Sequence, residues 1–139
     1  MKKSCQFLDT VLIIMAKVGT TPEQSDRLIK AGLDFHTADM IWVKEDDSFH
    51  IGKTFKYSGL TFPIWSLSAL LSLIPPYLGE FNENIDFGFS KAMNGKWYSA
   101  HYLQTADNGE VSGVKTVTGK DAVDAAVELV LWLLENKKI

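Results

Sequence analysis

The chain of 139 residues contains one cysteine, Cys5, and therefore cannot form an internal disulfide bond. No set of cysteine and histidine residues has the spacing of a zinc site. A reducing cytoplasm is the natural setting for such a sequence. We expect an inert thiol at Cys5, no metal site and no cofactor.

The chain contains a single arginine, Arg27, and 13 lysines that are spread along the sequence. Its net charge is −3. Proteins that bind nucleic acids usually gather Lys and Arg against phosphate and use arginine to read guanine. Nucleic-acid binding is therefore disfavoured unless the lysines meet on one face.

Long hydrophobic runs are also missing, because segments such as Val11–Ala16 are far shorter than the ~20 residues that cross a bilayer. Residues 1–18 begin like a secretion signal, but Gln6 and Asp9 interrupt the apolar part and no small-residue cleavage site stands out. We expect a cytoplasmic protein without a membrane span.

The composition, 46% hydrophobic and 22% charged, is that of an ordinary globular protein, with no repeat or low-complexity tract. The length fits one domain, residues 1–139, which buries about two thirds of its unfolded surface. Residues 1–20 are either a peripheral helix, from the spacing of Phe7, Leu8, Val11, Leu12 and Met15, or contain a buried strand at Val11–Met15.

Three further helices are marked by their ends. Thr21, Pro22 and Gln24 form a capping box with proline at the first helical position, and Gly32 is placed to end that helix. Ser66 caps a second helix, which carries Leu67, Leu70, Leu71 and Ile74 and stops at Pro75-Pro76.

The last predicted helix covers Lys120–Glu135, with a start at Thr118 and Asp121 that is similar to a capping box. Its polar positions form a narrow stripe, so the helix should be buried on most sides. It is either the central helix of the core or part of an oligomer contact.

Strands are expected at Met40–Lys44 and Phe49–Phe55, paired as a hairpin across residues 45–48. Three more are expected in a meander of Asn84–Met93, Lys96–Ala106 and Glu110–Val117. Asn94-Gly95 and Asn108-Gly109 join the meander, because both residue types tolerate the positive φ that two-residue hairpin turns require.

Two-residue turns fix the pairing of the meander. Lys91 would face Tyr98, Phe89 would face Ala100, and Phe87 would face Tyr102; Val114 would lie opposite Leu103 and Thr116 opposite His101. One face would then form the core, with Phe87, Phe89, Tyr98 and Tyr102. The sequence thus predicts an α+β fold, in which an antiparallel sheet of about four or five strands packs against three or four helices.

The other face of the meander holds the candidate site. His101 lies there in mid-strand, and its expected neighbours are Asp86, Ser90, Ser99, Trp97 and Thr116. A hydrolase would need a nucleophile, a base and an acid within hydrogen-bond reach, and neither serine lies in a nucleophile elbow. These residues are therefore candidates for binding a ligand, with a half-exposed sheet histidine as the simpler interpretation.

Shorter motifs favour structural roles. Gly52-Lys53-Thr54 lacks the first glycine of a phosphate-binding loop, because Asp47 stands in its place. Asp34, His36 and Asp39 fit a helix-to-strand loop better than a metal site. In that loop Asp34 would make a turn, Thr37 would cap a short helix and Asp39 would lie at the positive end of that helix. Glu45-Asp46-Asp47 with His50 fits a solvated turn.

Four large aromatic residues, Trp65, Trp97, Trp132 and Tyr77, are candidates for anchors of a binding surface. Their periodicity places most of them in the core. We expect one or two to be exposed.

Several separated motifs carry a resemblance to a known family, and they are Thr21–Ser25, Leu28-Ile29, Gly32–Asp34, Thr37–Met40, Pro63–Leu67, Ala69–Leu71, Ile74-Pro75, Asp124–Ala126 and Trp132–Asn136. Across roughly residues 20 to 139 the chain resembles small uncharacterised proteins encoded in gut anaerobic bacteria and their prophages or other mobile elements. The resemblance implies a genomic setting and no activity, and it assigns no site residue.

Two functions remain after these arguments. The first is a non-catalytic cytoplasmic accessory or interaction protein of a phage-like element, with a protein partner or self-association through surplus apolar surface. The second is a small-ligand-binding protein or small enzyme that uses a pocket around His101.

Overall fold

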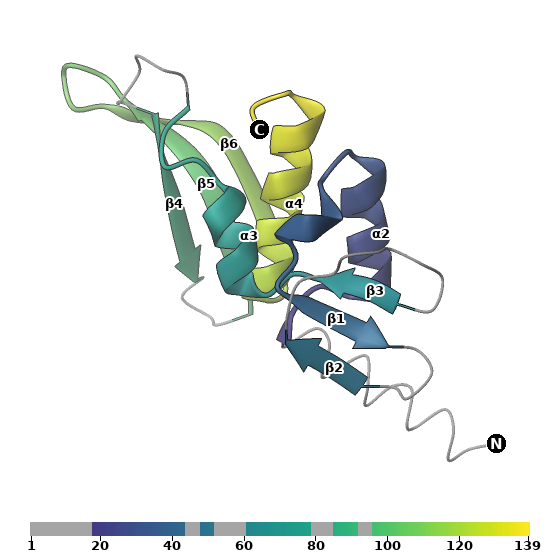
Figure 1. Cartoon of the computed structure of the whole chain (residues 1–139). Helices are drawn as coiled ribbons and strands as arrows, with labels where there is room; N and C mark the ends of the chain where they lie inside the picture. The colour runs from purple at the N-terminus through teal and green to yellow at the C-terminus, as the bar shows by residue number, and fades with distance from the viewer. Residues whose placement is uncertain (1–17, 44–47, 52–60, 79–84, 92–95) are drawn as a thin grey trace. The chain divides into compact units, whose positions relative to one another are not determined.

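The computed structural model describes residues 18–43, 48–51, 61–78, 85–91 and 96–139 (Figure 1). These residues form an α+β structure, as the sequence predicts, with three α-helices, one short 3-10 helix and two antiparallel sheets of three strands. The chain divides into two compact units, Met1–Ala69 and Leu70–Ile139, and each contains one sheet. The expected single sheet of four or five strands is therefore not found among these residues. The predicted N-terminal helix lies almost wholly outside them.

In the first unit, helix α2 (Pro22–Lys30) has the ends that its sequence predicts. Thr21 Oγ1 accepts a hydrogen bond from Gln24 N at 3.2 Å, and Gln24 Oε1 accepts one from Thr21 N at 3.0 Å. Gly32 takes a φ of 106°, and Leu33 N donates to Leu28 O across the helix end. Both predicted ends are confirmed, since this pairing is the Schellman motif that glycine favours.

The first sheet has the order β2-β1-β3, formed by β1 (Met40–Val43), β2 (Ser48–Ile51) and β3 (Thr61–Ile64). The β1–β2 pair confirms the predicted strand pairing. The sequence prediction contains no strand at β3, which includes Pro63. Strand β3 is an edge strand, where proline is tolerated. Met40, Trp42 and Ile64 form a buried cluster.

Thr20 joins two segments of the first unit that lie 45 residues apart. Its N–H donates to Trp65 O at 3.0 Å, and its Oγ1 accepts a hydrogen bond from Trp65 N at 3.1 Å. The same hydroxyl lies 2.8 Å from Ser25 Oγ, and Thr20 is fully buried. A threonine with no apolar periodicity thus occupies the interior, where its N–H and its hydroxyl both have partners.

Helix α3 (Leu67–Leu73) begins at the predicted cap, since Ser66 Oγ accepts a hydrogen bond from Ala69 N at 3.1 Å. Ser66 also donates its N–H and its hydroxyl to the two carboxylate oxygens of Asp39. The helix ends before Pro75-Pro76, as expected.

The second sheet has the order β4-β5-β6, formed by β4 (Ile85–Lys91), β5 (Tyr98–Thr105) and β6 (Val111–Gly119). The β4–β5 register is the predicted one, with Lys91 opposite Tyr98, Phe89 opposite Ala100 and Phe87 opposite Tyr102. The turn at Asn94-Gly95, from which that register was deduced, lies outside the described residues.

The turn between β5 and β6 is wider than the predicted two-residue turn. Ala106 N donates to Glu110 O at 2.8 Å, so Asp107, Asn108 and Gly109 form the loop, with Gly109 at a φ of 87°. The extra loop residue shifts the β5–β6 pairing near the turn by one residue relative to the prediction. A β-bulge between Leu103 and Tyr102 then restores the predicted pairing toward the middle of the sheet.

The bulge decides which predicted pairs of the β5–β6 hairpin hold. His101 faces Thr116 as expected, whereas Leu103 faces Gly113 and not Val114. The prediction was therefore right toward the middle of the sheet and wrong near the turn.

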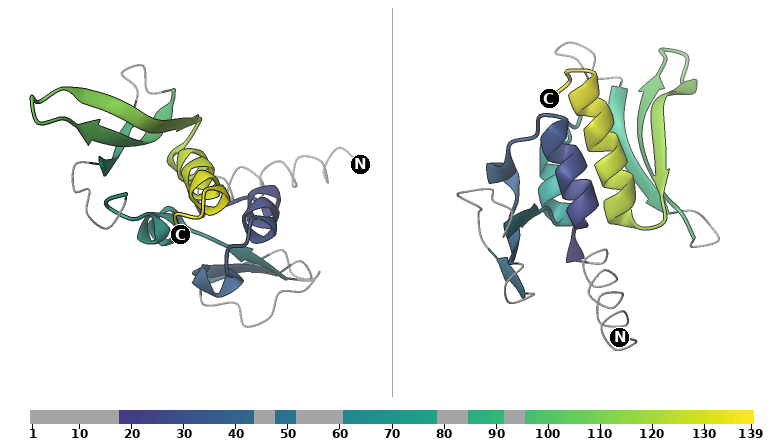
Figure 2. Two further views of the ribbon diagram at one scale, coloured as in Figure 1. Left: turned by 90° about the horizontal axis from the view of Figure 1, so that it is seen from above. Right: turned by 90° about the vertical axis from the view of Figure 1, so that its right-hand side faces the viewer.

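Helix α4 (Ala122–Glu135) packs on β5 and β6 (Figure 2). Asp121 is its N-cap and accepts a hydrogen bond from Asp124 N at 2.8 Å, whereas Thr118 belongs to β6. The predicted start with Thr118 as a cap was therefore wrong. Eight of the 14 helix residues are buried, which confirms a helix buried on most sides.

Tyr102 is central to the core of the second unit. It is fully buried beside Ala100, and its ring centroid lies 6.3 Å from that of Trp132 in α4. Its hydroxyl donates to Pro75 O at 2.7 Å. The other members of the predicted core face, Phe87, Phe89 and Tyr98, are half-buried.

Burial raises the pKa of Tyr102 to about 12. The unfolded chain releases this proton near pH 10, so the contribution of Tyr102 to stability is complete below pH 10 and is lost as the pH rises from 10 to 12. We expect the wild-type free energy of unfolding to fall by on the order of 2 kcal/mol from this residue over that range. Urea denaturation between pH 9 and pH 12, monitored by circular dichroism, measures the fall.

Tyr102→Phe isolates the effect. The variant should lose about 1 kcal/mol at neutral pH, because Pro75 O loses its donor, and should show a weaker alkaline decline than the wild type. Tyr77→Phe, at an exposed tyrosine, is the control and should keep the wild-type decline. An unchanged alkaline decline in Tyr102→Phe would contradict this assignment.

Candidate functional site

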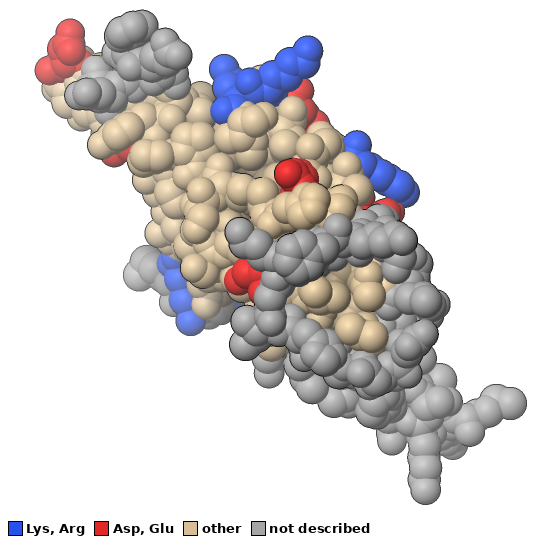
Figure 3. Space-filling view, viewed as in Figure 1, with Lys and Arg blue, Asp and Glu red and all other residues tan. Residues whose placement is uncertain are grey.

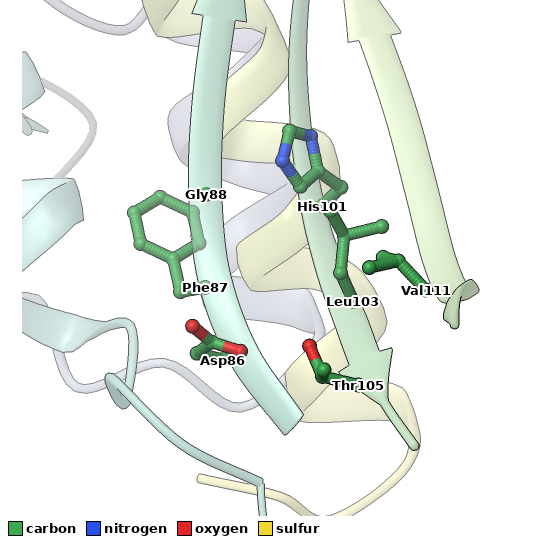
Figure 4. Close-up of a pocket in the computed structure, with 7 residues that line it drawn as sticks. All are labelled: Asp86, Phe87, Gly88, His101, Leu103, Thr105 and Val111. Carbon is green, nitrogen blue, oxygen red and sulfur yellow. The ribbon is translucent and has the colours of Figure 1, made fainter. Parts of the chain in front are cut away.

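The face of the second sheet that points away from α4 is called here the open face. Strand alternation gives its members, because residues directly opposite each other in antiparallel strands point to the same side. They are Asp86, Gly88 and Ser90 of β4; Ser99, His101, Leu103 and Thr105 of β5; and Val111, Gly113, Thr116 and Thr118 of β6. Figure 4 views this face with α4 behind the sheet.

A shallow hollow of about 210 Å³ lies on the open face, lined by Asp86, Phe87, Gly88, His101, Leu103, Thr105 and Val111 (Figure 4). His101 and Leu103 are half-buried, whereas Asp86, Thr105 and Val111 are exposed. The hollow therefore offers one carboxylate, one imidazole and one hydroxyl at a solvent-exposed, partly apolar surface.

Two of the five candidate residues, His101 and Asp86, line this hollow. Ser90 and Ser99 lie elsewhere on the open face, with their hydroxyl oxygens 2.9 Å apart across the β4–β5 pair. Trp97 precedes β5 and is 46% exposed. Four of the five candidates thus share one side of the sheet, as predicted, without forming one cluster. Trp97, which was predicted on the same face, lies outside the described strands.

The candidate groups are not linked as a catalytic chain. In the described part of the protein, no hydrogen bond joins His101 to Asp86 or to either serine. Nucleophilic catalysis relies on a base within hydrogen-bond reach of the nucleophile. The two serines instead donate and accept between themselves, so the face presents separate polar groups.

The imidazole of His101 lies directly over Gly88 in the facing strand. A Cβ atom at position 88 would overlap with Nε2 of the ring, so only glycine leaves room for this arrangement. A glycine inside a strand is the sequence signal for such a close approach, and it was not used in the sequence analysis. His101 therefore covers exposed backbone in addition to lining the hollow.

The loop with Asp34, His36 and Asp39 does not gather its side chains on one point. Asp34 Oδ1 accepts hydrogen bonds from His36 N and Nδ1, both at 2.9 Å, whereas Asp39 accepts from Ser66 at the start of α3. The hydrogen bond from the His36 backbone is the main cause that lowers the pKa of Asp34. The predicted turn at Asp34 is confirmed. Asp39 serves a different helix from the one expected.

No three His, Cys, Asp or Glu side chains of the described residues lie in a group that could hold a metal ion. The stretches Gly52-Lys53-Thr54 and Glu45-Asp46-Asp47, and Cys5, lie outside these residues. No helix in the described ranges is long and apolar enough to cross a membrane.

The large aromatic residues divide between the interior and the surface. Trp65 is fully buried, Trp132 is half-buried, and Tyr77 and Trp97 are 52% and 46% exposed. This confirms the expectation that one or two of the four are exposed. On the side of the molecule in Figure 3, the Lys and Arg side chains of the described residues stand in separate places.

Two glycines of the second sheet differ in what an added methyl group would contact, which is backbone at Gly119 and a side chain at Gly88. Gly119→Ala would place a Cβ 2.5 Å from Ala125 N in the backbone of α4, so it should lower the free energy of unfolding by roughly 2 kcal/mol. Gly88→Ala meets only a half-buried ring that can rotate, so it should cost less than about 1 kcal/mol while displacing His101. Urea denaturation measures both effects.

The imidazole C–H resonances of His101 report the displacement in Gly88→Ala by NMR, with His101→Ala as the assignment control. A loss of stability in Gly88→Ala as large as that in Gly119→Ala would show that the ring is held in place, against this prediction.

No family model, curated protein or solved structure matches the chain. The resemblance of residues 20–139 to proteins of gut anaerobes and their mobile elements therefore stays a prediction.

Proposed function

We propose that this chain is a non-catalytic interaction protein that binds a protein partner with the open face of its second sheet. The observation that carries the proposal is the combination, on one exposed sheet face, of apolar side chains with polar groups that are not linked for catalysis. Val111 is 59% exposed, and Leu103 lies beside it in the hollow. Apolar surface rimmed by polar groups is typical of protein interaction sites.

The size of the hollow favours this function over the binding of a small molecule. Pockets for small ligands usually enclose about 300 to 1,000 Å³ and surround most of the ligand. The hollow of about 210 Å³ is shallow, and three of its lining side chains are exposed. A protein side chain inserted from above is a better fit to this shape than an enclosed metabolite.

The proposed setting is the cytoplasm of a bacterium that carries a phage-like element. Its support is the sequence resemblance described above and the scarcity of cysteine.

The second candidate is a small-ligand-binding protein or small enzyme that uses His101. One observation favours it: Asp86 and His101 line the same hollow, where a ligand that donates and accepts hydrogen bonds could contact both. The test below separates the two functions.

The proposal predicts that a partner depends on Val111. Immobilised wild-type protein is exposed to an extract of a host that carries the gene, and bound proteins are quantified by mass spectrometry. Val111→Lys should lose the partner by about tenfold or more, because a charge would be buried in the contact. Ile139→Lys, which changes another exposed apolar residue to lysine off the open face, should retain it.

The outcome that contradicts the proposal is equally specific. If Val111→Lys and Ile139→Lys recover the same proteins as the wild type, the open face is not the binding surface. If a metabolite co-purifies and is lost in His101→Ala, the second candidate replaces the first.

A further inference from the structure

The two edges of the second sheet differ in how their backbone groups are used. At the outer edge of β4, Leu78 N donates to Ile85 O and Phe87 N donates to Pro76 O, both at 3.0 Å, and Tyr77 forms a bridge with Asp86. The segment from Pro76 to Leu78 thus covers that edge at Ile85–Phe87. Within the described ranges, β6 pairs with β5 alone.

Strand β6 is an exposed edge. It has nine residues, more than any other described strand, and most of them are exposed, including Val111, Val114, Thr116 and Thr118. An edge strand carries a row of backbone N–H and C=O groups that another strand can pair with. This row is a second binding element of the unit, separate from the hollow on the open face.

The sequence of β6 contains few features that usually protect an edge. It has no proline and no acidic residue, and its one charged residue is Lys115. The Lys115 ammonium lies 6.0 Å from the centre of the Trp132 ring, on the side of the sheet covered by α4. The bulge at Gly113 and Val114 is the one protective device. It leaves Lys115–Thr118 as a regular segment.

We propose that Lys115–Thr118 of β6 pairs in antiparallel orientation with the same segment of a second copy of this chain. The pairing would join the two sheets into one continuous sheet of six strands about a two-fold axis. The inference rests on the proposed interaction role, and it identifies a second copy as one partner of this unit.

A second copy fits this edge because the segment is compatible with itself. Facing residues in antiparallel strands point to the same side, which leaves two central registers. In the first, Thr116 faces Thr116 of the copy and Val117 faces Lys115. In the second, Val117 faces Val117 of the copy and Thr116 faces Thr118. Threonine pairs and β-branched pairs across strands are favourable. In both registers the two copies of Lys115 are not opposite each other. A β-branched segment whose one charge, on Lys115, lies over the Trp132 ring offers little to select a charged peptide instead.

The length of the segment determines the strength of the association. A regular edge of four residues supplies few hydrogen bonds, and contacts that bury less than about 1,200 Å² are typical of transient complexes. The two copies should therefore exchange between monomer and dimer as the protein concentration changes.

The test is the mass of the full-length protein in solution as a function of concentration, by sedimentation velocity. The wild type should shift from monomer to dimer between about 10 μM and 1 mM, the range of weak affinities. Thr116→Lys should raise the dimer dissociation constant about tenfold, because it places lysines near each other across the two-fold axis. Thr118→Lys provides a second variant at the same edge.

Ser90→Lys is the matched control, because it adds the same charge to the same face on β4, at the opposite edge of the sheet from β6. It should dimerise like the wild type, and all variants are first checked for a wild-type circular dichroism spectrum. A wild type that stays monomeric at 1 mM, or dimers unaffected by both threonine variants, would overturn the β6 pairing.

Failure of this inference can be told apart from failure of the proposed function. A monomer that still captures a partner through Val111 overturns only the pairing of β6. A dimer sensitive to Thr116→Lys that captures nothing through Val111 overturns only the partner of the open face. A monomer that also captures nothing overturns both.

Discussion

The register of β5 between its two neighbours is the constraint on which the second unit depends. Successive residues of a strand point to opposite faces, so this register sends Ala100 and Tyr102 into the core and leaves His101 and Leu103 on the open face. A slip by one residue would expose Tyr102 and bury His101 under α4. Packing of Tyr102 against Trp132 and its bond to Pro75 therefore fix the core and the candidate site together.

Local signals predicted those parts of the fold that short sequence segments determine. The capping box at Thr21, the glycine at position 32 and the serine cap at position 66 all occur as the sequence indicates, because each depends on residues within one helical turn. The β4–β5 register followed from pairing rules alone. The second turn differs because Asn108-Gly109 suits both two-residue loops and three-residue loops with glycine last. The choice between them depends on the bulge beyond Leu103.

Contacts between distant segments could not be predicted in this way. Thr20 and Trp65 are 45 residues apart, and Asp39 and Ser66 are 27 residues apart, yet these pairs connect the parts of the first unit. Neither pair produces a periodic pattern, since each involves single polar residues satisfied by a partner elsewhere in the chain. At the candidate site, strand alternation predicted the correct face for His101, but not its contact with the neighbouring strand. The ring of His101 lies over Gly88 because glycine has no Cβ atom to occupy that space in the neighbouring strand.

The surfaces of the second sheet that remain free limit what this unit can do. One face is packed against α4, and the outer edge of β4 is paired at Ile85–Phe87 with the segment from Pro76 to Leu78. On the open face the hydroxyls of Ser90 and Ser99 satisfy each other, and the ring of His101 covers the backbone at Gly88. In the described part of this unit, the apolar surface at Val111 and the backbone of β6 stay available for binding. Both favour contact with another polypeptide over the transformation of a small molecule, because one supplies apolar area and the other a row of backbone hydrogen-bonding groups.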